Sequence, residues 1–340
     1  MVMGIRRWMQ ASAARSASRA VALGTVLAAG LTLAAGQAAA QAWPSKPVRL
    51  VVPFPAGGST DVVGRVVAQE LSLRLGQQVV VDNRPGASGT VGSEAAARMP
   101  ADGYTLLLSN VGSQGVGPAL FPSVKYNTMA DFTHIGMIGT FTNVVLVNTG
   151  LPVKTVGELV ALAKKSNGKL SYATSGHGST NHFLGELFNH HAGVKIVHVP
   201  YKGSGPALND LIGKQIDMMY DSLPSAAQHI KSGTVRAIGM ASAERVAAFA
   251  EVPTLKESGL GKLVISNWFG LSAPARVPPE VVARLSTELK AVLSQPATVA
   301  RLAELGLVAQ SMTPEQFSSF VAADLASWVD AVRETGIKVD

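Results

Sequence analysis

The chain of 340 residues contains no cysteine. This absence excludes disulfide bonds, thiolate metal sites, a cysteine nucleophile and a lipid anchor on an N-terminal cysteine. A chain of this length can bury a sizeable core without covalent staples. Because 47% of the residues are hydrophobic and only 15% are charged, the composition indicates a folded protein of one or two domains.

The signature motifs of several enzyme classes are also missing. The sequence has no GxxxxGKS or GxxxxGKT phosphate-binding loop, and no GxGxxG follows its first expected strand. It lacks the GxSxG elbow of serine hydrolases, the DTG and DSG triplets of aspartic proteases and the HExxH motif of zinc proteases. No nucleophile–base pair is visible, and we predict that the protein is not an enzyme.

Positive charge is concentrated at the N-terminus, in a segment without acidic residues. The basic residues of this segment are Arg6, Arg7, Arg15 and Arg19. Val21–Ala35 is an apolar stretch, and Ala40–Ala42 has the small-x-small pattern of a signal-peptidase site. An uncleaved membrane anchor is the alternative, but the apolar stretch is short for one. We therefore predict that residues 1–42 are a signal peptide cleaved after Ala42, and that the mature protein is exported.

The mature chain has an ordinary charge balance. Subtracting the four arginines from 29 basic residues leaves 25 against 22 acidic ones, a net charge of +3. No block of five like charges remains, so we expect no nucleic-acid partner and no binding to an anionic membrane surface. The uncharged runs 103–124 and 132–153 are interrupted by polar residues and glycine, which argues against a membrane span.

Short apolar runs alternate with helical patterns along the mature chain. Val48–Pro53 is typical of a buried strand, and Thr60–Leu75 carries apolar residues at helical spacing. Further strands are expected at 79–81, 105–108, 170–173, 195–199, 218–220, 235–241 and 265–272. Further helices are expected at 91–99, 180–191, 205–212, 278–293 and 314–335. This alternation predicts a parallel sheet with helices on its faces.

The α/β pattern occurs in two runs, which indicates two lobes. The extended stretches near 135–148 and 235–245 are the places where the chain is expected to cross from one lobe to the other and return. We predict that residues 43–143 and 244–340 form lobe 1 and that residues 144–243 form lobe 2.

Three glycine-containing loops connect an expected strand to an expected helix. They are Pro53–Asp61, Pro85–Thr90 and Thr174–Asn181. A helix N-terminus offers unpaired N–H groups and a partial positive charge, which suit an anion. Any one loop could simply be a capped helix start, since Ser59, Thr60 and Ser179 are good N-caps. Three such loops at the carboxyl ends of strands favour a ligand site.

Five histidines lie within 22 residues. They are His177, His182, His190, His191 and His198. A metal site needs converging imidazoles, and the spacing does not predict them, because His190 and His191 point to different faces of a helix. We interpret all five as incidental, and we predict no metal site and no cofactor.

Other polar side chains near the loops allow two interpretations each. Asp61 lies in the first turn of an expected helix, where a carboxylate either stabilises the helix dipole or lines a cleft. Asp221 and Tyr201 each follow an expected strand and could reach the same cleft. Lys202 is either an anion partner or an ordinary loop lysine.

Several motifs, in this order, resemble those of the Bug-type substrate-binding proteins of tripartite tricarboxylate transporters. They are WPSKPVRLVVPFPAGGSTD, VVVDNRPGASGTVGS, PADGYTLLLS, PYKGSGPALNDLIGKQIDMMYDS and EVPTLKESG. The resemblance spans Trp43 to Asp340. It implies a class II periplasmic-binding-protein fold, in which two α/β lobes with a ligand cleft between them close over a small carboxylate. It also implies a periplasmic location and integral membrane transporter subunits as partners, and we expect a monomer.

The resemblance further implies which residues contact the ligand, mostly through backbone amides. Carried over by motif, these are Phe54, Ala56, Gly57, Gly58, Ser59, Thr60, Asp61, Ala87, Ser88, Gly89, Gly176, Ser179, Thr180, Tyr201 and Asp221. The sequence departs from many relatives at Ser175–Gly178, so His177 is a candidate determinant of ligand preference. Two other classes stay open: a ligand sensor for a membrane histidine kinase, and an exported enzyme that uses the same cleft.

Overall fold

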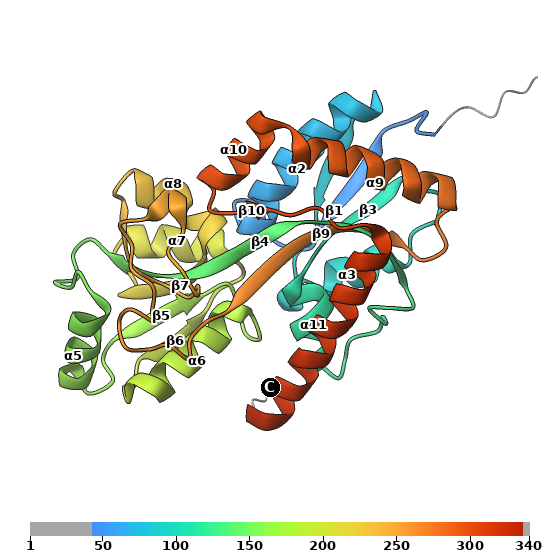
Figure 1. The fold of residues 1–340 in the computed structure, drawn as a ribbon. Helices are drawn as coiled ribbons and strands as arrows, with labels where there is room; N and C mark the ends of the chain where they lie inside the picture. Colours follow the sequence, from blue (N-terminus) through green and yellow to red (C-terminus); the bar gives the residue numbers. More distant parts are fainter. Residues whose placement is uncertain (1–42, 336–340) are drawn as a thin grey trace, which may run out of the picture. The chain divides into compact units, whose positions relative to one another are not determined.

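The computed structural model describes residues 43–335, and the signal peptide expected at residues 1–42 lies outside them. The strands are β1 (Val48–Val52), β2 (Val79–Asn83), β3 (Thr105–Asn110), β4 (Phe132–Asn148), β5 (Ser171–Thr174), β6 (Val197–Pro200), β7 (Met218–Ser222), β8 (Val235–Met240), β9 (Ser266–Pro274) and β10 (Val308–Ala309). The α-helices are α2 (Ser59–Leu75), α3 (Thr90–Ala97), α4 (Gly117–Leu120), α5 (Val156–Ser166), α6 (Thr180–Ala192), α7 (Ser204–Ile212), α8 (Leu223–Lys231), α9 (Pro279–Ser294), α10 (Pro296–Glu304) and α11 (Pro314–Thr335). All of these elements belong to one unit, which begins at Lys46 (Figure 1).

Strands β1, β2 and β3 form a parallel group at one end of the sheet. β1 lies in the middle and pairs in parallel with both neighbours. Every residue of β1 except Arg49 is buried, as expected for a strand with helices over both faces. This arrangement confirms the β-α-β-α-β unit predicted from the sequence.

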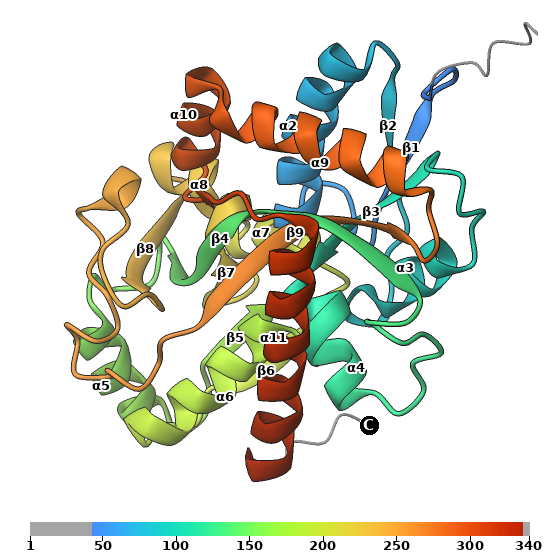
Figure 2. The same cartoon turned by 45° about the vertical axis from the view of Figure 1, so that its right-hand side comes forward.

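Two long strands, β4 and β9, connect this group to the rest of the sheet. The first part of β4 pairs antiparallel with β9, and its last part pairs antiparallel with β7 and β8. β9 also pairs antiparallel with β3. The strand order is β2-β1-β3-β9-β4-β7-β5-β6, with β8 and β10 also paired to β4 (Figure 2). The prediction of a parallel sheet is therefore wrong at the centre of the sheet. There β9 pairs antiparallel with β3 and β4, and β4 pairs antiparallel with β7.

A second parallel group lies at the other end of the sheet. β5 pairs in parallel with β6 and β7. Large side chains such as Tyr172, Phe188 and Tyr220 fill the core between these strands and their helices. Helix α5 also packs here and was not predicted, although Thr155 and Glu158 form a capping box at its start. The fold is thus a two-lobed α/β architecture.

The C-terminal helices return to the first parallel group. α9 and α10 contact α2, and α11 contacts β4 and α4 (Figures 1 and 2). Phe317 of α11 packs so closely on β9 that a Cβ atom at Gly270 would lie 2.0 Å from its ring. The lobe boundaries near residues 143 and 243 stay a prediction. Among the described residues, no helix has both the length and the apolarity needed to cross a bilayer.

Candidate functional site

Two adjoining cavities lie at the glycine loops. The inner cavity is lined by Phe54, Pro55, Gly58, Ser59, Thr60, Ser88, Asn110, Val111, Gly112, Phe141, Ser175, Ser179, Thr180, Asn181, Ser204, Ser222, Asn267 and Phe269. The outer cavity is lined by Phe54, Pro55, Pro85, Gly86, Ala87, Ser88, Gly89, Phe121, Ser175, Gly176, His177, Pro200, Tyr201, Lys202 and Gly203. The empty space of each, about 520 Å³ and about 1250 Å³, is partly open to solvent. The three loops identified in the sequence thus meet at one place.

The first loop presents the start of α2 to the inner cavity. Gly58 is the N-cap and has extended backbone, with no side-chain cap. Ser59 and Thr60 follow it and line the cavity. The first N–H groups of a helix have no intrahelical partner, so this end of α2 offers donors and a partial positive charge to a ligand.

Asp61 stabilises this loop through hydrogen bonds, although it lines neither cavity. Its carboxylate accepts hydrogen bonds of 3.0 Å from the Gly57 backbone N–H, from Arg65 Nε and from Asn83 Nδ2. Burial by itself would raise the pKa of Asp61, but these hydrogen bonds and the Arg65 charge outweigh burial and lower the pKa. The carboxylate therefore stays ionised and fixes the loop.

The second and third loops touch each other. The Ser88 hydroxyl donates a 2.6 Å hydrogen bond to the His177 carbonyl. Ser88 has a positive φ of 51°, and Gly89 beside it lies so close to Phe54 that a Cβ atom would come within 2.8 Å of the ring. Ser88 lines both cavities, so this contact links the second and third loops beside them.

The third loop ends at the start of α6, which also faces the inner cavity. Ser179 is the N-cap, and its hydroxyl accepts a hydrogen bond from the His182 N–H. Thr180 and Asn181 follow it and line the cavity. Two helix starts, from α2 and α6, therefore converge on one space.

Three asparagines of the inner cavity have buried polar atoms that need a partner. Asn110 Nδ2, Asn181 Oδ1 and Asn267 Oδ1 find no hydrogen-bond partner in the described part of the chain. Buried polar groups are normally paired, so these atoms suit a ligand or ordered water. Sequence reasoning missed Asn110 and Asn267, and the signal available was a polar amide inside an apolar strand.

Asp221 acts on the inner cavity through serines. It is fully buried, and it accepts hydrogen bonds from Ser204 Oγ at 2.6 Å and Ser225 Oγ at 2.7 Å. Burial raises the pKa of Asp221 to about 6, although these hydrogen bonds oppose the shift. Ser204 and Ser222 line the cavity, whereas Asp221 does not.

The expected ligand contacts divide into three groups. The inner cavity is lined by Phe54, Gly58, Ser59, Thr60, Ser88, Ser179 and Thr180. The outer cavity alone is lined by Ala87, Gly89, Gly176 and Tyr201. Neither cavity is lined by Ala56, Gly57, Asp61 or Asp221. The contacts themselves stay predictions.

The lining of the inner cavity determines what it can do chemically. Among the described residues, none that lines it is acidic, basic or a histidine. Phe141 and Phe269 stack with ring centroids 4.4 Å apart and give it an apolar wall. The cavity therefore combines hydrogen-bond donors and helix dipoles with an apolar surface, and it suits a small anion with a carbon skeleton.

Comparisons with known proteins give a consistent result. A family model described as tripartite tricarboxylate transporter family receptor matches residues 63–337. Protein BugT of Bordetella pertussis is 39% identical over 301 residues, which cover 88% of this chain and 92% of BugT. The structure of Rpa4515 of R. palustris with adipate aligns with a TM-score of 0.84 and 34% identity, covering 87% of this chain and 99% of that one. MatC of Rhodopseudomonas palustris with bound malate aligns with a TM-score of 0.79 and 32% identity, covering 85% and 100%.

Proposed function

We propose a specific role for this chain, which belongs to the tripartite tricarboxylate transporter receptor family: it captures a small carboxylate in the inner cavity and delivers it to integral membrane subunits of such a transporter. Similar proteins hold adipate and malate, which supports the carboxylate class. The protein acts in the periplasm as a monomer, after cleavage of its signal peptide behind Ala42.

The observation that carries this proposal is the meeting of two helix starts in a cavity without charged side chains. Ser59 and Thr60 of α2 and Thr180 of α6 bring unpaired N–H groups and aligned dipoles to one space. A carboxylate placed there accepts these hydrogen bonds, while the amides of Asn110 and Asn267 are available to the rest of the ligand. The stacked pair of Phe141 and Phe269 packs against its carbon chain.

Capture proceeds by closure of one lobe on the other, as periplasmic binding proteins do. We assign residues 43–143 and 244–340 to lobe 1 and residues 144–243 to lobe 2. The hydrogen bond from Ser88 to the His177 carbonyl and the close approach of Gly203 to Pro55 hold the two lobes together. We propose that binding is not coupled to chemistry, in keeping with the receptor family to which the chain belongs.

Isothermal titration calorimetry of the purified mature chain tests this function. Native mass spectrometry first identifies any acid that co-purifies, and the protein is then unfolded, washed and refolded to remove it. Adipate, malate, tricarboxylates, amino acids and aromatic acids are titrated, each beside a neutral amide of the same skeleton. We expect at least one acid to bind with a Kd of about 1 μM or below, roughly −8.2 kcal/mol, and its amide to bind at least about a hundredfold more weakly.

Two results would contradict the proposal. One is co-purification of a neutral or cationic solute, with no acid binding below about 1 mM. The other is equal affinity for an acid and its amide, which would mean that the helix starts do not select the charge. Uptake of the identified acid by cells that lack the gene, compared with complemented cells, tests delivery to the transporter.

A further inference from the structure

Three of the five histidines that we interpreted as incidental converge in the structure. His177, His182 and His198 each place a ring nitrogen within 4.8 Å of the others. The ring centroids of His182 and His198 stack 4.2 Å apart, and the ring of His177 stands edge-on to both, at 5.5 Å and 5.1 Å. The three side chains thus form one cluster, which the spacing along the sequence did not predict.

Local backbone structure explains the convergence. His177 belongs to the third loop and not to α6, whose N-cap is Ser179. Gly176 and Gly178 on either side have positive φ values of 137° and 68°, which turn the loop back toward the helix. His182 lies in the first turns of α6, and His198 comes from the neighbouring strand β6.

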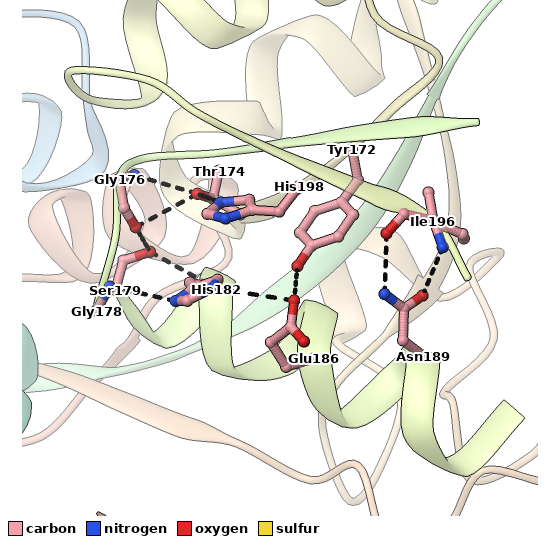
Figure 3. Close-up of polar contacts among 10 residues, drawn as sticks. All are labelled: Tyr172, Thr174, Gly176, Gly178, Ser179, His182, Glu186, Asn189, Ile196 and His198. Carbon is pink, nitrogen blue, oxygen red and sulfur yellow. Dashed lines mark hydrogen bonds and ion pairs between the residues drawn. The ribbon is translucent and has the colours of Figure 1, made fainter. Parts of the chain in front are cut away.

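The two less exposed rings have polar partners (Figure 3). His198 Nε2 lies 2.7 Å from Thr174 Oγ1, and His182 Nε2 lies 3.9 Å from Glu186 Oε1. His182 Nδ1 accepts a 3.3 Å hydrogen bond from the Gly178 backbone N–H, which a metal bound at this nitrogen would displace. Glu186 Oε1 also accepts a 2.5 Å hydrogen bond from the Tyr172 hydroxyl. Hydroxyl and carboxylate contacts of this kind orient imidazoles that bind metals.

We propose that His177, His182 and His198 form a binding site for a divalent transition-metal ion such as Zn²⁺ or Ni²⁺. Tetrahedral bonds of about 2.0–2.1 Å place ligand nitrogens about 3.3 Å apart, so the cluster must contract by up to about 1.5 Å. His177 is the residue that moves, because it is exposed and its flanking glycines permit a change of loop conformation. Three imidazoles leave a coordination position for water, and imidazole donors select zinc, nickel or copper over magnesium and calcium.

Calorimetric titration of metal ions into the mature chain tests the site. Any affinity tag is removed, the protein is treated with EDTA and dialysed, and ZnCl₂, NiCl₂ or MgCl₂ is added at about pH 7.5. We expect one equivalent of Zn²⁺ or Ni²⁺ to bind with a Kd of about 10 μM or below, and Mg²⁺ not to bind. His177→Ala should weaken Zn²⁺ binding at least tenfold.

The matched control removes the other two histidines of α6, His190 and His191, which are exposed. The double variant His190→Ala/His191→Ala should bind Zn²⁺ within about twofold of the wild type.

Thermal unfolding gives a second measurement, in which Zn²⁺ raises the Tm of the wild type and the control but not that of His177→Ala. The proposal is overturned if the wild type binds neither metal at 100 μM, or if the control loses as much affinity as His177→Ala. It is likewise overturned if His177→Ala binds like the wild type. None of these measurements depends on the carboxylate ligand, so they test the metal site independently of the proposed function.

Discussion

The inner and outer cavities share Phe54, Pro55, Ser88 and Ser175 but differ in how they can hold an anion. The inner cavity offers helix starts and buried amides, which the backbone and the packing hold in place. The outer cavity offers Lys202, an exposed side chain on a loop. Donors fixed before binding lose little entropy when the ligand arrives, whereas a free lysine must be ordered. We therefore expect the inner cavity to select the carboxylate that we propose as the ligand.

The largest effect should come from adding a negative charge to the inner cavity. Asn181 is buried and lines the inner cavity. Asn181→Asp replaces the NH₂ group of its side-chain amide by an oxygen, with almost no change in shape. The new carboxylate repels an anionic ligand where little water screens it, yet it suits the first turn of α6 and preserves the fold. Calorimetry at about pH 8 should show affinity reduced at least a hundredfold, about 2.7 kcal/mol.

The control for this variant is Asn209→Asp, which adds the same charge on the exposed side of α7. Its affinity should stay within about twofold of the wild type. Wild-type affinity in Asn181→Asp would place the carboxylate outside the inner cavity.

A smaller loss is expected from filling the space at the first helix start. Gly58→Val adds a branched side chain at the N-cap of α2, where the backbone is extended and accepts valine. Ligand oxygens should then be displaced, with affinity falling at least tenfold, about 1.4 kcal/mol. Gly57→Asn is the control, because Gly57 has a positive φ that asparagine tolerates and lines neither cavity. Equal losses in both variants would show that the loop backbone, and not the cavity space, is what matters.

The contact between the second and third loops should have a moderate effect. Ser88→Ala removes the hydrogen bond to the His177 carbonyl and so weakens the closed form, by about threefold to tenfold in affinity. Stopped-flow measurements should assign most of this loss to faster ligand release. Ser294→Ala removes a similar hydrogen bond on the exposed side of α9 and should change nothing. An unchanged release rate in Ser88→Ala would indicate that closure does not depend on this contact.

The smallest effect is expected in the outer cavity. Lys202→Met keeps the apolar stem of the side chain and removes the charge. Affinity should stay within about threefold, less than about 0.7 kcal/mol, when measured by calorimetry with the ligand identified above. A hundredfold loss would reverse the comparison and make Lys202 the principal partner of the carboxylate.

Local patterns in the sequence were sufficient for much of the fold and for part of the site. The apolar run at β1, the helical spacing of α2 and the glycine loops that follow β1, β2 and β5 all lie where the sequence predicted them. These features depend on neighbouring residues, because strand period, helix period and capping are short-range properties. The loops after β1 and β2 share an edge because these two strands are parallel. β5 belongs to the other parallel group, which runs in the opposite direction, so the meeting of the third loop with the first two depended on the long strands β4 and β9.

The amides of the inner cavity could not be found in the same way. Asn110 ends β3, and Asn267 lies on β9, two strands that pair although more than a hundred residues separate them. No short-range rule predicts that β9 inserts between β3 and β4, or that it runs antiparallel to both. Asparagine inside an apolar strand was the available signal, but it does not say what the side chain faces.

The sequence by itself determined that this is an α/β protein with anion-suited loops, since those properties follow from local periodicity and from glycine at strand-to-helix connections. Only the tertiary structure decided which polar groups share a space. It placed Asp61 and Asp221 outside the cavity lining, where Asp61 accepts a hydrogen bond from Gly57 of the first loop and Asp221 accepts one from Ser204. It also brought His177, His182 and His198 together. The physical reason is that side-chain proximity depends on strand order and loop conformation, which are set by long-range packing and not by spacing along the chain.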